Sequence, residues 1–356
     1  MTMLLVVFAL ALIACGGQES VTAPVLNPAT PVKAGKAVAA DRAALVALYE
    51  ATGGDSWPDN TNWLSEVRLG SWEGVYVNSD GRVIYLRIKN NQLSGEIPPQ
   101  LGHLENLRWL DLSGNQLSGE IPPQLGHLEN LRWLDLSDNQ LSGEIPPELG
   151  HLENLQDLRL RKNQLSGEIL PQLDHLENLR RLDLGGNQLS GEIPPELGHL
   201  ENLQDLRLRR NQLSGEIPSQ LGHLENLRRL DLSDNQLSGE IPPELGHLEN
   251  LRWLYLGNNQ LGGAYELDHF ESLQDLFLSG NWLRRAIPPE LGHLENLRWL
   301  DLSNNQLSGT IPPELDNLVN LQWLDLGGNQ LSGCVPPALF KLFSDSYWIT
   351  SVGCDG

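Results

Sequence analysis

The stretch LRWLDLSGNQLSGEIPPQLGHLEN, from Leu107 to Asn130, is followed by a near copy that begins at Leu131. The copies share one asparagine, which recurs every 24 residues apart from a single step of 22. Its eleven positions are Asn91, Asn115, Asn139, Asn163, Asn187, Asn211, Asn235, Asn259, Asn281, Asn305 and Asn329. A stacked repeat array needs roughly three copies to be stable, so this sequence predicts a long solenoid.

The pattern within each unit predicts one coil of that solenoid. In LRWLDLSGN, apolar and polar residues alternate, so Leu110 and Leu112 point inward from a short strand while Trp109 and Asp111 point outward. The asparagine that follows can bond backbone groups at the turn out of the strand. A Pro-Pro pair carries the chain back, and the leucines of QLGHL fill the rear of the core. With parallel strands ~4.8 Å apart, eleven coils make an arc of about 50 Å.

The pattern LxxLxLxxNxLSGxIPxxLGxL resembles the plant-type leucine-rich repeat, and the match covers residues 83–333. Segment 37–82 looks like the N-terminal cap of those proteins, whose pattern is W-x-G-V-x-C; Val77 stands at the Cys position, so that cap disulfide is absent. The resemblance implies an α/β leucine-rich repeat solenoid with a concave parallel β-sheet and N- and C-terminal caps. No N-x-S/T sequon and no kinase-like segment accompanies the repeats. We therefore expect a bacterial surface form of the fold rather than a receptor kinase.

The first 15 residues have the features of an export signal. Leu4–Ile13 is an apolar run too short to span a bilayer, and LIACGG resembles a bacterial lipobox in which Cys15 is lipidated. Segment 16–36, rich in Pro, Ala, Thr and Gly, predicts a flexible tether. We expect an exported protein that is lipid-anchored to the bacterial membrane or cell surface. No Lys or Arg precedes the apolar run, so a signal peptide cut after Ala9–Ala11, which would give a secreted protein, is the alternative.

The N-terminal end of the repeat array needs a cap that covers the open core. Asp41 is expected as the N-cap of a short helix whose apolar face includes Leu45, Leu48 and Tyr49. A hairpin with its turn at Ser79–Gly81 follows.

Residues 334–356 break the repeat pattern and form the predicted C-terminal cap. Cys334 replaces the usual Glu of SGEIP, and Cys354 lies 20 residues later. With Cys15 assigned to the lipid, these two cysteines remain as a pair, and an exported protein can oxidise them. The sequence therefore predicts a Cys334–Cys354 disulfide that closes the cap.

The formal net charge of -22 argues against nucleic acid as a partner, because phosphates would be repelled. The chain contains no metal-type Cys cluster and no H-E-x-x-H, G-x-S-x-G or phosphate-binding glycine motif. We expect no enzyme activity, no catalytic residues, no metal and no cofactor.

Histidines recur in the repeats, each two residues before a Glu. A metal-binding or pH-sensing ladder is one interpretation. A solvated outer face that is copied with its repeat is the other, and we favour it. The histidines are His103, His127, His151, His175, His199, His223, His247, His269 and His293.

Outward strand positions vary more than the rest of the unit and form two columns. From Asp157 to Asp231 their charges alternate along and across strands, so they can neutralise one another. The first column is Tyr85, Trp109, Trp133, Asp157, Arg181, Asp205, Arg229, Trp253, Asp275, Trp299 and Trp323. The second is Arg87, Asp111, Asp135, Arg159, Asp183, Arg207, Asp231, Tyr255, Phe277, Asp301 and Asp325.

Aromatic residues replace these charges toward the C-terminal end. Exposed aromatic clusters rimmed by charge mark binding surfaces, although the rings could instead stack on each other and stiffen the sheet. The same region holds the one shortened coil, Gly262–Ser272, and the unusual stretch NWLRRAIPPE, with Trp282, Arg284 and Arg285. The candidate ligand-binding residues are Trp253, Tyr255, Phe277, Trp299 and Trp323.

The copied residues thus build a scaffold, and the uncopied outward residues carry specificity. The sequence predicts a non-catalytic cell-surface binding protein that recognises a protein or peptide on its concave face. We expect a monomer that meets a membrane only through its lipid anchor. Carbohydrate binding is one alternative, because aromatic faces also stack on sugar rings. A purely structural or adhesive surface protein is another.

Overall fold

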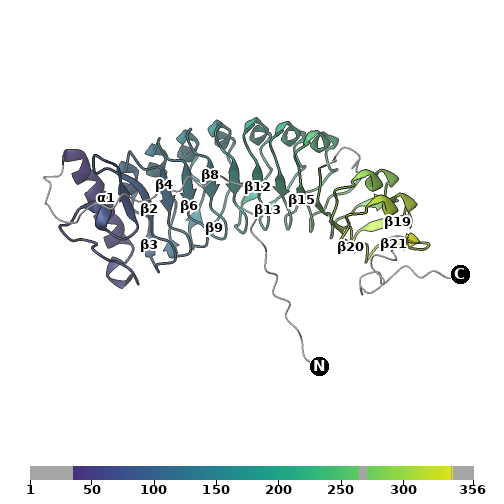
Figure 1. Ribbon diagram of the computed structural model, residues 1–356, viewed down its shortest axis with the longest axis horizontal. Helices are drawn as coiled ribbons and strands as arrows, with labels where there is room; N and C mark the ends of the chain where they lie inside the picture. The colour runs from purple at the N-terminus through teal and green to yellow at the C-terminus, as the bar shows by residue number, and fades with distance from the viewer. Residues whose placement is uncertain (1–34, 264–269, 271, 338, 340–356) are drawn as a thin grey trace, which may run out of the picture.

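The computed structural model describes residues 35–263, 270, 272–337 and 339. They form an elongated arch of stacked coils with short helical turns along its outer edge (Figure 1). Cys15, Cys354, segment 1–34 and most of the shortened coil lie outside the described residues. No described helix has the length and apolar content that a membrane crossing requires.

A 12-stranded sheet forms the concave side, as predicted, and the coils follow one another along it in chain order. The hairpin strand β1 pairs antiparallel with β2, and every later strand pairs parallel with its neighbour. The strands are β1 Val75–Val77, β2 Val83–Arg87, β4 Trp109–Asp111, β6 Trp133–Asp135, β8 Asp157–Arg159, β10 Arg181–Asp183, β12 Asp205–Arg207, β14 Arg229–Asp231, β15 Trp253–Tyr255, β16 Asp275–Phe277, β18 Trp299–Asp301 and β20 Trp323–Asp325.

A second set of short parallel strands lines one flank of the arch, where the chain leaves the conserved asparagine. These strands are β3 Ser94–Glu96, β5 Gln116–Ser118, β7 Ser142–Gly143, β9 Gln164–Leu165, β11 Ser190–Gly191, β13 Gln212–Leu213, β17 Arg284–Arg285, β19 Gln306–Thr310 and β21 Gln330–Ser332. They pair as β3-β5, β7-β9, β11-β13 and β17-β19-β21. We refer to the surface over these strands as the flank.

Within the described residues, nine short 3-10 helices close coils on the convex side, at the sequence PPQLGH and its variants. Proline at the first turn fits this position, because its fixed φ suits the helix and its missing N–H is not needed there. The helices are η3 Pro99–His103, η4 Pro123–His127, η5 Pro147–His151, η6 Pro171–His175, η7 Pro195–His199, η8 Ser219–His223, η9 Pro243–His247, η10 Pro289–His293 and η11 Pro313–Asn317.

The core between these surfaces is a stack of leucines. The middle residue of each strand pairs in register with the same residue of the next, as Leu110 does with Leu134. Both are completely buried, and so are the rear leucines Leu101 and Leu104. Fully burying one such side chain contributes about 2 kcal/mol. The inward leucines predicted from the alternating pattern are therefore confirmed.

The conserved asparagine joins successive coils. Asn115 Nδ2 donates to the carbonyl of Leu112 in its own coil at 2.8 Å and to that of Ile88 in the preceding coil at 2.8 Å. Its Oδ1 accepts from the Leu93 N–H at 3.1 Å. The same pair of donations recurs at each asparagine up to Asn329. The predicted role of this residue at the turn is confirmed, and its partners lie in two coils rather than one.

Glycine is required where the flank strands turn. Gly143 has a φ of +77°, and a Cβ on it would lie 2.8 Å from Cγ of Glu120 in the preceding coil. Both conditions exclude a larger residue without strain. Glycine therefore lets the coils stack closely at this position.

The N-terminal cap differs from the prediction at one point. Its helix α1 spans Lys36–Ala51, so Asp41 lies inside the helix and does not cap it. The buried Asp41 carboxylate instead accepts hydrogen bonds from Arg82 Nε at 2.9 Å and from the Val83 N–H at 2.8 Å. A tertiary ion pair thus uses the oxygens that a helix cap would have used. The predicted burial of Leu45, Leu48 and Tyr49 is confirmed.

Candidate ligand-binding face

The concave face displays the two outward columns in register. Each side chain lies beside its counterpart on the next strand, as Trp109 does beside Trp133 and Tyr255 beside Phe277. The parallel pairing continues without a shift from β2 to β20. Residues that differ between coils are therefore presented together on one continuous surface.

The C-terminal aromatic group comprises Trp253, Tyr255, Phe277, Trp299 and Trp323. All five side chains are half-buried rather than fully exposed. The ring centroids of Tyr255 and Phe277 lie 5.2 Å apart, those of Phe277 and Trp323 lie 5.9 Å apart, and those of Trp299 and Trp323 lie 6.1 Å apart. Four of the five rings are therefore one connected patch.

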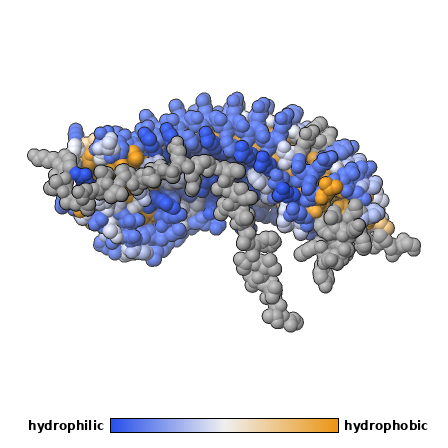
Figure 2. All heavy atoms as spheres, in the orientation of Figure 1, coloured by the Kyte–Doolittle hydropathy of each residue, from blue (hydrophilic) through white to orange (hydrophobic). Residues whose placement is uncertain are grey.

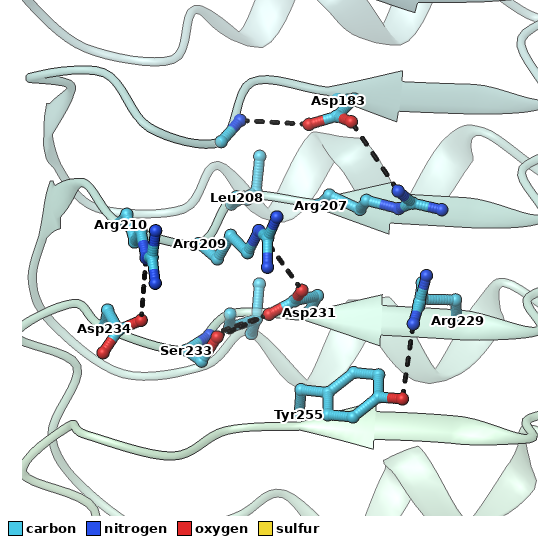
Figure 3. A network of polar contacts seen from close by, with 12 residues as sticks. Asp183, Arg207, Leu208, Arg209, Arg210, Arg229, Asp231, Ser233, Asp234 and Tyr255 are labelled. Carbon is cyan, nitrogen blue, oxygen red and sulfur yellow. Dashed lines mark hydrogen bonds and ion pairs between the residues drawn. The ribbon is translucent and has the colours of Figure 1, made fainter. Parts of the chain in front are cut away.

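Trp253 is linked to this patch through the guanidinium group of Arg229. The Arg229 guanidinium lies 5.6 Å from the Trp253 ring and 5.0 Å from the Tyr255 ring, within the range of cation–π attraction. Arg229 Nη2 also donates to the Tyr255 hydroxyl at 3.3 Å (Figure 3). Arg229 therefore marks the border between the aromatic group and the charged strands before it.

A carboxylate fixes the orientation of the Tyr255 ring. The Tyr255 hydroxyl donates to Asp275 Oδ2 at 2.7 Å. Burial, followed by this hydrogen bond, raises the pKa of Tyr255 above its ordinary value. Burial also raises the pKa of Asp275. Tyr255 stays protonated at neutral pH and is held in place as a donor.

The charged middle of the face is a network of ion pairs. Arg159 Nε lies 2.8 Å from Asp157, Arg181 Nε lies 3.1 Å from Asp205, and Arg207 Nη2 lies 2.7 Å from the same Asp205. Burial raises the pKa of Asp157 despite the neighbouring Arg159. These charges bond to one another, as the alternating pattern predicted.

The same network continues toward β15. Asp183 lies 3.9 Å from Arg207, and Arg209 Nε lies 3.8 Å from Asp231 (Figure 3). The Ser233 hydroxyl donates to Asp231 at 2.6 Å. Because these side chains already have internal partners, a ligand would have to compete for them.

A second aromatic group, missed in the sequence analysis, lies at the N-terminal end of the face. The rings of Trp109 and Trp133 are parallel with centroids 4.1 Å apart, and the Arg159 guanidinium covers the other side of Trp133 at 4.0 Å. Tyr85 stacks on Trp109 at 6.2 Å, and Tyr76 meets the Tyr85 edge at 6.4 Å.

The faces of this N-terminal stack are covered by its own members, so it offers a ligand mainly ring edges. These rings stack on each other in the way that the sequence analysis considered for the C-terminal aromatic residues. Three of the residues are consecutive in the first outward column, and that run of aromatic residues could have predicted the group from the sequence. Tyr76 comes from outside the repeats, from β1, and no repeat pattern could reveal it.

A polar groove of about 1250 Å³ lies on the convex side of the first coils. Its walls carry repeated His and Glu residues, including His103, His127, Glu105 and Glu129. Among the residues that the structure describes, no cluster of His, Cys, Asp or Glu could hold a metal ion. In Figure 2 the outer ridge is hydrophilic, whereas hydrophobic residues show mainly near the two ends of the arch. The groove has the character of a copied, solvated surface.

Family models match most of the repeat region. A model described as a leucine-rich repeat region matches residues 82–194 and 187–306, and one described as leucine-rich repeats (2 copies) matches residues 295–338. Among curated proteins, a probable inactive leucine-rich repeat receptor-like protein kinase of Arabidopsis thaliana is 43% identical over 53 residues. That alignment covers 15% of this chain and 8% of the kinase.

Solved structures of plant proteins match more of the chain. The plant peptide hormone receptor RGFR1 in complex with RGF2 is 41% identical with a TM-score of 0.69, over 70% of this chain and 40% of the receptor. The PEPR1–AtPEP1 structure is 35% identical with a TM-score of 0.79, over 85% of this chain and 44% of the matched chain. A plant ice-binding protein is 32% identical with a TM-score of 0.66, over 84% of this chain and 89% of that protein. This chain thus spans less than half the length of either receptor chain.

Proposed function

This chain belongs to the leucine-rich repeat family, and we propose that it is a non-catalytic binding protein that recognises a protein or peptide on its concave face. The observation that carries the proposal is the C-terminal aromatic group. It combines three copies of the repeat's tryptophan with Tyr255 and Phe277, which stand where most coils carry a charged residue, and four of the rings contact one another on a single surface. Aromatic anchors of this kind typically dominate the affinity of protein interfaces.

The structural relatives support a peptide ligand. RGFR1 is described as a peptide hormone receptor and was solved with RGF2, and PEPR1 was solved with AtPEP1. Both match this chain with sequence identities above 30%. The ligand of this chain would lie across the C-terminal aromatic group, with Arg229 as a hydrogen-bond donor at its edge.

The proposal extends to where the protein acts. An export signal, a lipidated Cys15 and the tether that follows would hold the repeats away from a bacterial membrane and present the concave face to the surroundings. The LIACGG stretch supports this placement. Mass spectrometry of the N-terminal peptide of the native protein checks it, and an unmodified peptide that begins at Leu12 would contradict it.

A direct test compares two outward residues of the same column. Peptides are selected from a random display library on the purified protein and titrated against Trp299→Ala and Arg181→Ala. We expect Trp299→Ala to weaken binding by about 2 kcal/mol or more, because it removes an anchor ring. Arg181→Ala should cost about 1 kcal/mol or less, because the Arg181 guanidinium already pairs with Asp205 at 3.1 Å and a ligand would have to compete for it.

Both variants must keep the circular dichroism spectrum of the wild type. If Arg181→Ala abolishes binding while Trp299→Ala keeps it, the charged middle is the recognition surface and the assignment is wrong. If neither variant changes the affinity, the ligand binds outside the concave face.

A second candidate function is binding to ice. One observation in its favour is the match to the plant ice-binding protein, which covers 89% of that protein's length. The other is that the flank carries columns of identical exposed residues. One such column is Gln116, Gln140, Gln164, Gln188, Gln212 and Gln236, which are all exposed. Inhibition of ice recrystallisation by the wild type, lost when alternate glutamines are changed to Lys, would support this function. No inhibition would exclude it.

A further inference from the structure

One coil of the flank departs from every other. Where the repeats read QLSGE after the conserved asparagine, the coil after Asn281 reads Trp282, Leu283, Arg284, Arg285 and Ala286. Leu283 remains completely buried, so the coil keeps its core residue. The other four side chains are exposed. The change is therefore confined to the surface.

Arg285 occupies the position of a turn glycine. Its φ is +77°, close to the +81° of Gly309 in the next coil. The other ten coils have glycine there: Gly95, Gly119, Gly143, Gly167, Gly191, Gly215, Gly239, Gly263, Gly309 and Gly333. A non-glycine residue in this conformation is strained, and such strain concentrates at functional sites.

The preceding coil differs in a matching way. In most coils a Cβ on the turn glycine would meet the Glu side chain of the coil before, as Gly143 would meet Glu120 at 2.8 Å. The residue at that Glu position before Arg285 is Ala264 in the sequence. Ala264 carries no side chain beyond Cβ, so the sequence has no Glu side chain at this position of the preceding coil. Two neighbouring coils thus depart from the repeat sequence together.

The patch reverses the local charge. The flank of the earlier coils carries a column of exposed glutamates: Glu96, Glu120, Glu144, Glu168, Glu192, Glu216 and Glu240. The column ends at Glu240, and in this coil Ala286 occupies the same position with two exposed arginines beside it in the sequence. Arg284 Nε donates to Gln306 Oε1 at 3.1 Å, and neither guanidinium forms an ion pair with any residue that the structure describes.

Trp282 gives the patch an apolar centre. Half of its surface (50%) is exposed, which is more than for any other described tryptophan. Trp282 and Arg284 are two residues apart in extended chain, so their side chains leave the same face. Exposed Trp and Arg are the residue types that most often anchor protein interfaces.

We propose that Trp282, Arg284 and Arg285 form a second docking surface, on the flank rather than the concave face, for an acidic extended segment of another protein. The carboxylates of that segment would pair with the two guanidinium groups, and an apolar side chain would pack on the indole ring. The net charge of -22 repels an acidic segment from the rest of the molecule, so the basic patch also directs where it binds.

The test restores the copied sequence. In Trp282→Gln, Arg284→Ser and Arg285→Gly, separately and together, each residue becomes the one that most coils already carry, so the fold is kept. The probe is a fluorescein-labelled twelve-residue peptide of Glu, Leu, Gly and Ser, with a matched peptide in which Gln replaces Glu. Fluorescence anisotropy is measured with the full chain at low and high salt.

We expect the acidic peptide to bind at least about tenfold more tightly than the Gln peptide, and we expect its affinity to fall as the salt concentration rises. The triple variant should lose at least about tenfold in affinity. The affinity should be unchanged in Arg210→Gln, which removes one positive charge elsewhere and is matched to each single arginine variant, and in Trp299→Ala, on the concave face. Arg285→Gly should also raise the midpoint of thermal unfolding by about 2 °C, because it relieves strain.

Equal binding of the acidic peptide to the wild type and the triple variant would overturn the proposal. So would a preference for the Gln peptide. Self-association in sedimentation velocity that Trp282→Gln abolishes would assign the surface to a second copy of the chain instead. Because the concave variant Trp299→Ala is included, a failure here is distinguishable from a failure of the function proposed for the concave face.

Discussion

At the residue scale, the conserved asparagine has the clearest structural role. Asn187 donates to the carbonyls of Leu160 at 3.1 Å and Leu184 at 2.9 Å, and it accepts from the Leu165 N–H at 3.1 Å. Its side chain is almost entirely buried. A buried backbone group without a partner costs about 1–3 kcal/mol. A single amide thus satisfies three groups that water cannot reach.

Replacing Asn187 by Ala should therefore lower the free energy of unfolding of the surrounding coils by about 3 kcal/mol or more. Hydrogen exchange of β8, β10 and β12 measures this change. The matched control is Asn202→Ala, because Asn202 donates a 2.9 Å hydrogen bond to the carbonyl of Glu177 at an exposed site. It should cost less than about 1 kcal/mol. Equal losses at the two sites would contradict the account.

The residue scale also shows what sequence reasoning can find. The asparagine and the inward leucines follow from the repeat because they have the same kind of partners in successive coils, and the outward columns follow from the alternating pattern. Tyr76 did not follow from it, because its contact with Tyr85 depends on how the hairpin meets the first coil. The strain at Arg285 follows from its backbone angle φ, which only the structure provides, although the glycine column already marked the position.

At the element scale, α1 is attached to the solenoid through one buried ion pair. The Arg82 side chain is only 14% exposed, and its guanidinium contacts both oxygens of Asp41. The hydrogen bond to this carboxylate raises the pKa of Arg82. The rings of Trp57, Trp63 and Trp72 pack beside the helix, with Trp57 and Trp63 centroids 4.9 Å apart, and cover the end of the core. The cap therefore combines this buried ion pair with a cluster of indoles.

Asp41→Ala should destabilise the cap by about 3 kcal/mol, because it leaves a buried guanidinium without its partner. Increased hydrogen exchange in α1, with unchanged exchange in β10 and β12, is the expected signature. Asp80→Ala removes an exposed carboxylate from the nearby hairpin turn and serves as the control. An α1 that stays protected in the Asp41 variant would show that the indole cluster alone holds the cap.

The N-terminal helix also shows why a local rule failed. An Asp before an apolar run is a good helix start, and Asp41 fits that description. The structure begins the helix at Lys36, because the Asp41 carboxylate bonds to Arg82 and Val83 from another element. A contact between residues 41 apart in the sequence is invisible to a rule that considers neighbouring residues only. The apolar face of the same helix was predictable because its period is local.

At the scale of the whole molecule, each coil bonds mainly to the coil before and the coil after it. Stability in such an array is approximately a sum of nearest-neighbour terms, so damage at one end stays near that end. The chain also carries a net charge of -22, which favours solubility but repels other acidic surfaces. The ends of the arch are therefore where stability and binding are most easily changed.

Reduction of the predicted Cys334–Cys354 disulfide should loosen the last coils first. Closing a loop of this length contributes on the order of 3 kcal/mol in the chain-entropy model. We expect faster hydrogen exchange in β18, β19, β20 and β21 after reduction, and unchanged exchange in β6, β8 and β10. Cys334→Ser should give the same pattern without reductant. Free thiols in the native protein, or a uniform loosening of all coils, would count against the disulfide.

The asparagine ladder has a consequence for how the molecule can change length. Because every internal coil presents the same hydrogen-bonding groups to its neighbours, removing or inserting one 24-residue unit leaves matching ends that can rejoin. Residues 151–198 and 199–246 are nearly identical, so recombination between their gene segments would remove or insert two such units in frame. Each unit gained or lost would move Trp253 relative to Trp133, now five strand steps and roughly 24 Å away, by about 4.8 Å. Duplication or deletion of repeats can thus change the distance between the two aromatic groups in fixed steps, while the residues of each group stay the same.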